Sequence, residues 1–143
     1  MEDARLRHPP PTAADQSAMI ECLAAALAPH GEIDFAYVHG SFAEGLAYHD
    51  IDVAVFLGQP PPRERFVDEA ARLAAELTSA IALEVDVQVL NSAPLGFQHA
   101  VLQGLPILVR DDVRLADYIE QVSMEYMDYA ELRRRHFREV LGR

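Results

Sequence analysis

Polar and apolar residues alternate along part of this chain in the manner of half-buried β-strands. The alternation is clearest over residues 83–90, where leucine and valine occupy every second position. Because side chains of a strand point alternately to its two faces, we expect Glu84, Asp86 and Gln88 to share the face opposite the core. The other apolar segments that predict strands are residues 33–39, 50–57 and 104–109. Pro106 cannot donate to a β-ladder, which places the last strand at an edge of the sheet.

Apolar residues three and four positions apart predict helices before, between and after these strands. The first helix should begin at Thr12, which can form a capping box with Asp15, and it should end before Pro29. Residues 91–94 (Asn-Ser-Ala-Pro) are expected to cap a later helix. The predicted helices cover residues 12–27, 42–46, 63–81, 94–103 and 111–141.

Strands that alternate with helices indicate an α/β protein with a mixed β-sheet flanked by helices. A chain of 143 residues can bury one sizeable core, so we expect a single domain over residues 1–143. Residues 1–11 should form an irregular lead-in, and residues 111–141 a long C-terminal helix.

The charge balance argues against nucleic acid as a direct partner. The formal net charge is −11, whereas a domain that grips DNA or RNA through phosphates needs a basic surface. All 12 basic residues are arginine, which excludes a lysine–AMP intermediate and a Walker A phosphate loop. The single Cys22 permits neither an internal disulfide nor a cysteine-based metal site. No apolar run approaches membrane-spanning length and no signal-peptide core is visible, so we expect a soluble cytoplasmic protein without membrane contact.

Two carboxylates stand one residue apart where the predicted strand at 50–57 begins. Asp50 and Asp52 should point to one face, and two like charges there need compensation, for which a divalent cation is the usual group. A solvent-exposed strand start is the simpler explanation, but the nearby Gly40-Ser41 turn favours a metal site. Such a turn at the start of a helix offers backbone N–H groups and a hydroxyl, which suit a phosphate.

Asp86 is a third candidate, and its role depends on the order of the strands. If the strand at 83–90 lies beside the strand at 50–57, Asp86 joins the face of Asp50 and Asp52. It could then complete a two-metal site or deprotonate an attacking hydroxyl. Otherwise Asp86 belongs to the wet face of an edge strand.

Gly40-Ser41, a short spacer and Asp50-x-Asp52 on a strand resemble the signature of the nucleotidyltransferase superfamily. The pattern is most similar to the minimal nucleotidyltransferases of the MntA type, antitoxins that pair with a HEPN-domain toxin. The spacer, Phe42 to His49, has eight residues and is shorter than is common in that family. The strand around Asp86 looks like the family's third-carboxylate strand.

This resemblance implies the nucleotidyltransferase fold and a Mg²⁺-dependent transfer of AMP from ATP. Asp50, Asp52 and Asp86 would be the catalytic metal ligands, and Gly40 and Ser41 would bind the nucleotide phosphates. The implied acceptor is a tyrosine hydroxyl of a HEPN toxin, which AMP attachment silences. Two alternatives stay open. One is an antitoxin that only masks its toxin, an alternative that the short spacer supports, and the other is a small-molecule nucleotidyltransferase. A homo-oligomer is also left open.

Overall fold

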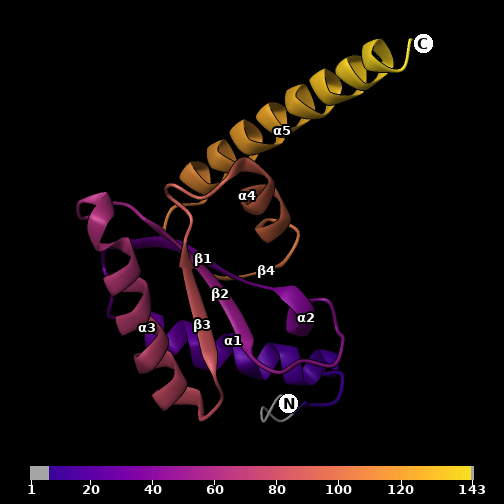
Figure 1. Ribbon diagram of the computed structural model, residues 1–143. Helices are drawn as coiled ribbons and strands as arrows, with labels where there is room; N and C mark the ends of the chain where they lie inside the picture. The colour runs from indigo at the N-terminus through magenta and orange to yellow at the C-terminus, as the bar shows by residue number, and fades with distance from the viewer. Residues whose placement is uncertain (1–6, 143) are drawn as a thin grey trace.

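The computed structural model describes residues 7–142, in which one four-stranded sheet is flanked by helices (Figure 1). The strands are β1 (Ile33–His39), β2 (Ile51–Leu57), β3 (Val85–Val89) and β4 (Leu105–Val109). The helices are α1 (Ala13–Leu27), α2 (Gly40–Ala43), α3 (Phe66–Ile81), α4 (Leu95–Val101) and α5 (Asp112–Val140), with a 3₁₀ turn η1 (Arg63–Arg65) before α3. The predicted α/β class with a mixed, helix-flanked sheet is confirmed.

The strand order is β3-β2-β1-β4. β1 runs antiparallel to both β2 and β4, whereas β2 and β3 are parallel. The edge position predicted for the strand that contains Pro106 is therefore confirmed. β3 lies directly beside β2, which is the order on which the predicted grouping of the carboxylates depended.

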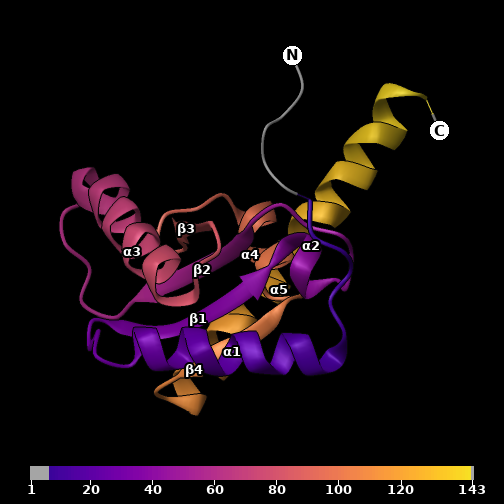
Figure 2. The same cartoon turned by 90° about the horizontal axis from the view of Figure 1, so that it is seen from below.

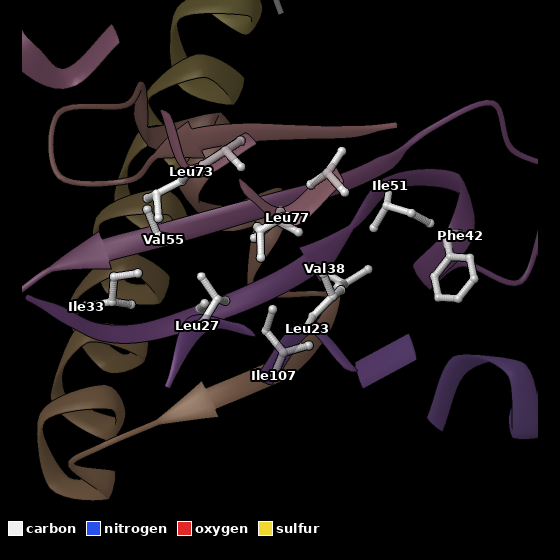
Figure 3. Close-up of a cluster of buried hydrophobic side chains, with 14 of the residues drawn as sticks. Leu23, Leu27, Ile33, Val38, Phe42, Ile51, Val55, Leu73, Leu77 and Ile107 are labelled. Carbon is white, nitrogen blue, oxygen red and sulfur yellow. The ribbon is translucent and has the colours of Figure 1, made fainter. Parts of the chain in front are cut away.

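Helices cover both faces of the sheet, and the sheet divides the core into two layers. On one face, leucines of α1 and α3 pack on branched side chains of the strands (Figure 3). On the other face, Val101 of α4 and Leu115 of α5 pack on Phe35, Tyr37 and Ala54. Figure 2 shows α1 in front of the sheet, with α4 and the start of α5 behind it. No described helix has the length and apolar character that a membrane crossing requires.

Several element ends differ from the prediction for local reasons. The capping box of Thr12 and Asp15 forms as expected, and Asp111 caps α5 by accepting from two backbone N–H groups. The helix predicted at 42–46 begins earlier, at Gly40, and is the single turn α2. The strand expected from Asp50 begins one residue later, at Ile51.

The cap predicted for residues 91–94 is confirmed in position, since Pro94 is the N-cap residue of α4, but no side chain caps this helix. The Asn91 side chain bonds to β2 instead. The Asn91 amide accepts from the Leu57 backbone N–H at 2.8 Å and donates to the Leu57 carbonyl at 2.8 Å. The Asn91 side chain thus extends the pairing of β3 with β2 beyond the last residue of β3. The predicted irregular lead-in contains one β-bridge, between His8 and Tyr48, and its first six residues lie outside the described part of the chain.

Candidate active site

Three adjacent strands bring polar side chains together at one end of the sheet. Asp52 of β2 is the direct register partner of Asp86 on β3, and on its other side it pairs with His39 of β1. Residues at alternate positions share a face, so Asp52 lies on the same face as Ala54, the face that α4 covers. Phe97 of α4 meets the His39 ring edge-on, with ring centroids 5.4 Å apart.

Ser41 of α2 and Asp50 of the loop between α2 and β2 lie near this cluster. Asp50 stands one residue before β2 and is partly buried. A pocket on this side of the molecule is lined by both Ser41 and Asp50, together with Arg7 and His49. The structure therefore places all the predicted site residues at the same end of the sheet. Their predicted roles remain to be tested.

Asp52 lies in an environment that disfavours its negative charge. Burial, the first cause, raises the pKa of the Asp52 carboxyl, and the nearby charges of Asp50 and Asp86 raise it further. His39 acts in the opposite direction and lowers this pKa. A cation bound at these carboxylates would offset the repulsion, so the electrostatics fit the predicted metal site.

The position next to the Asp52 carboxylate accepts only a glycine, Gly40. A Cβ atom at this position would collide with the Oδ2 atom of Asp52. The backbone of Gly40 also has φ = 76°, in the left-handed region that side chains other than glycine rarely adopt. Gly40 opens α2, and the opening N–H groups of a helix have no intrahelical partner. The result is backbone N–H groups without an intrahelical partner next to a carboxylate, with the exposed Ser41 side chain beside them.

Two residues that the sequence analysis did not select belong to the site. His39 Nε2 lies 2.9 Å from Gln88 Oε1, and Gln88 Nε2 donates to Asp86 Oδ2 at 2.5 Å. Gln88 therefore links His39 to Asp86 and fixes the orientation of that carboxylate. The alternation along β3 already places Gln88 on the face of Asp86, and this was the available signal. His39 could not be separated from a bystander before its register with Asp52 was known.

The donor set suits Mg²⁺ that arrives with a substrate. Among residues 7–142, no three acidic, histidine or cysteine side chains are grouped closely enough to hold a metal ion by themselves. Mg²⁺ usually keeps several waters and binds through one or two carboxylates plus substrate phosphates. Asp50, Asp52 and Asp86 have carboxylate oxygens of this kind, next to the N–H groups at the start of α2.

No curated protein sequence matches the chain at a significant level. A chain in the complex of a tri-AMPylated Shewanella oneidensis HEPN toxin with an MNT antitoxin has a TM-score of 0.66 and 19% identity, covering 88% of this chain and 98% of that chain. A chain in a toxin–antitoxin crystal structure with AMP-PNP has a TM-score of 0.68 and 19% identity, covering 85% and 98%. Likeness at this level of identity establishes the fold.

The sequence itself also matches a family model, described as "Polymerase beta, Nucleotidyltransferase", over residues 21–113. This match includes every predicted site residue and all four strands of the sheet. The predicted nucleotidyltransferase fold is therefore confirmed. Since the match spans more than half of the chain, this protein belongs to the polymerase β-type nucleotidyltransferase family.

Proposed function

We propose that this nucleotidyltransferase transfers AMP from ATP to a hydroxyl of a partner protein, and that the partner is a HEPN-type toxin which the modification silences. The observation that carries the proposal is the register of β2 with β3, which sets Asp52 directly beside Asp86 and next to the turn at Gly40. The same surface thus offers metal-binding carboxylates and phosphate-binding N–H groups. The reaction would take place in the cytoplasm.

The turn at the start of α2 holds the β- and γ-phosphates of ATP in this proposal. The N–H groups at Gly40 and Ser41 and the Ser41 hydroxyl donate to the phosphate oxygens. The absence of a side chain at Gly40 leaves room for the Asp52 carboxylate directly beside these N–H groups. Asp50 and Asp52 would hold Mg²⁺, which when bound neutralises charge that develops on the pyrophosphate leaving group.

Asp86 serves the acceptor side of the reaction. The acceptor oxygen forms a bond to the α-phosphorus of ATP, while the bond from that phosphorus to the bridging oxygen breaks and pyrophosphate leaves. The acceptor proton passes to the Asp86 carboxylate, which Gln88 holds in place. Asp86 is exposed, so a hydroxyl carried by another protein can reach it.

The partner is proposed from the similar folds. One of the similar solved structures contains an AMPylated HEPN toxin with its MNT antitoxin, and another contains a toxin and antitoxin with AMP-PNP. The exposed position of Asp86 is consistent with a macromolecular acceptor. The net charge of −11 would attract a basic protein.

Incubation with labelled ATP, Mg²⁺ and the product of the neighbouring gene, as the candidate partner, tests the proposal. We expect label on the partner, loss of labelling with Asp86→Asn, and unchanged labelling with Glu84→Gln. Glu84 is a suitable control because it precedes Asp86 by two residues and is also exposed. If Asp86→Asn neutralises the toxin as well as the wild type does, and the toxin carries no AMP, the protein works by masking alone. That outcome would refute the enzymatic proposal.

A further inference from the structure

Helix α5 is 29 residues long, but only its first half packs on the rest of the protein. Leu115 and Val122 are buried, and Tyr126 stacks on His99 of α4 with ring centroids 3.8 Å apart. By contrast, every residue from 132 to 142 is exposed. Figure 1 shows this second half projecting away from the sheet and its covering helices. A long helix that extends into solvent without a covering partner needs an explanation.

The outward face of α5 is divided by charge along its length. Residues spaced alternately four and three apart stay on one side of a helix, and here that side is opposite Leu115 and Val122. The stripe begins at Val113 and ends at Leu141. Between them the stripe has an acidic part, Asp117 and Glu120, an apolar part, Met124 and Met127, and a basic part, Arg134 and Arg138. Glu131 lies on the same stripe, between the apolar and the basic part.

Neither charged part is neutralised within the described chain. Asp117 and Glu120 line an open groove with Met124, and no ion pair joins these two carboxylates to an arginine among residues 7–142. At the basic end, Glu131 is the only carboxylate of residues 7–142 within 4 Å of Arg134, at 2.7 Å, and of Arg138, at 3.8 Å. It also lies 3.9 Å from a third arginine, Arg135. One carboxylate shared by three guanidinium groups leaves the basic part with excess positive charge.

The apolar centre of the stripe is exposed as well. Met124 is 58% exposed and Met127 is 68% exposed. The two exposed methionines lie between an acidic and a basic segment. If a second copy of the stripe runs in the opposite direction, its basic segment meets the acidic segment of the first copy, and the methionines meet each other. Flexible methionine side chains suit a helix-to-helix contact of this kind.

We propose that two copies of this chain pair through α5 in antiparallel orientation, around a two-fold axis near Met127. This arrangement places Glu120 of each copy opposite the segment 134–138 of the other, and the methionines against one another. Symmetry then makes every favourable contact twice. Parallel pairing would instead set acidic against acidic and basic against basic segments. Each copy meets its own sheet and α4 with the opposite face of α5, so the two sheets lie on the outer sides of the helix pair.

Complementary charge reversal tests the pairing. One variant combines Arg134→Glu with Arg138→Glu, which makes the whole stripe acidic. A second variant combines Asp117→Arg with Glu120→Arg, which makes the stripe basic. Sedimentation equilibrium at low salt should give twice the monomer mass for the wild type and the monomer mass for each variant alone. An equimolar mixture of the two variants should recover the doubled mass.

Two controls make the result specific. Arg63→Glu with Arg65→Glu applies the same charge change at η1, far from the stripe in sequence, and should leave the doubled mass intact. Circular dichroism of each variant should show an unchanged helix content, because the altered side chains are exposed on the far face of α5.

A spin label at Leu141, introduced as Leu141→Cys in a Cys22→Ser background, tests the orientation. Antiparallel pairing separates the two labels by on the order of 40 Å, since about 28 residues at 1.5 Å each lie between them along the axis. Parallel pairing would bring them within roughly 20 Å, about two helix diameters.

A monomeric wild type at low salt, or a doubled mass in both charge variants alone, would overturn the proposal. A short distance between the labels would do the same. If the stripe is covered by the toxin instead, the chain will be monomeric alone and the charge variants will lose capture of the toxin. That pattern also overturns pairing between copies, and none of these measurements depends on nucleotidyl transfer.

Discussion

At the scale of single residues, Gly40 and Asp52 lie so close together that each limits which side chain the other position can carry. The missing side chain of Gly40 provides the space that the Asp52 carboxylate occupies. That carboxylate in turn faces two further negative charges, on Asp50 and Asp86, in a partly buried position. The apo protein therefore holds a destabilising arrangement at the place where we propose that metal and phosphate bind.

Asp52→Asn should stabilise the apo protein at neutral pH. The pKa of Asp52 is raised, so the native state holds the proton more tightly than the unfolded state does, and ionisation costs stability as the pH rises through this pKa. The amide variant avoids that loss. Its unfolding midpoint should exceed that of the wild type at pH 7, and the difference should disappear below about pH 4, near the ordinary aspartate pKa. Thermal unfolding from pH 3 to pH 8 measures this, and a midpoint below that of the wild type across the whole range would contradict it.

Gly40→Ala should cost both stability and activity. The left-handed backbone alone makes a side chain unfavourable by about 1–2 kcal/mol, and the new methyl group also displaces the Asp52 carboxylate. Gly45→Ala is the matched control, because Gly45 has the same φ of 76° but no atom within 4 Å of its added Cβ. Urea unfolding should show a loss in both variants, larger for Gly40→Ala. Labelling of the partner should fall only with Gly40→Ala, and equal labelling by the two variants would argue against a role for this contact.

At the scale of elements, the pairing of β3 with β2 decides whether the site exists. β3 is an edge strand of five residues, held on one side only. Its register is supported beyond the strand by Asn91, which makes two hydrogen bonds to the backbone of the buried Leu57. A slip of one residue would move Asp86 to the opposite face.

Asn91→Ala should therefore weaken both the fold and the site. Removing the amide leaves the N–H and the carbonyl of Leu57 without these partners, at a cost of about 1–3 kcal/mol. Ser92→Ala, at the exposed neighbouring position, should change the free energy of unfolding by less than about 0.5 kcal/mol. Hydrogen exchange of the β3 amides should increase in the first variant. Unchanged exchange there would show that Asn91 does not support the register.

At the scale of the whole molecule, charge and ligand binding act together. The protein has a formal net charge of −11, and three of its carboxylates converge on the end of the sheet where we place the phosphates of ATP. ATP without a metal should bind weakly against this charge, and Mg²⁺ without phosphates would lack part of its ligands.

Thermal stability should consequently rise far more with ATP and Mg²⁺ together than with either alone. At a ligand concentration about a hundredfold above the dissociation constant, linkage gives about 2.7 kcal/mol of added stability. The double variant with Asp50→Asn and Asp52→Asn should lose this response while remaining folded. If the wild type shows no shift with both ligands, an antitoxin that masks its toxin becomes the better explanation.

The sequence by itself determined the strand and helix order, because hydrophobic periodicity reports which faces are buried. It also determined the candidate carboxylates, since Asp50 precedes an apolar strand and Asp52 and Asp86 interrupt two apolar strands. Their grouping was decided only by the tertiary structure, because strand order depends on which surfaces pack together and not on any local pattern. The role of Asn91 was also decided by the tertiary structure. The sequence around Asn91 predicts a helix cap, whereas its side-chain amide bonds to two backbone groups of β2. His39 and Gln88 became site residues only when β1, β2 and β3 were set side by side, since contacts between residues 49 positions apart leave no periodic trace in a single sequence.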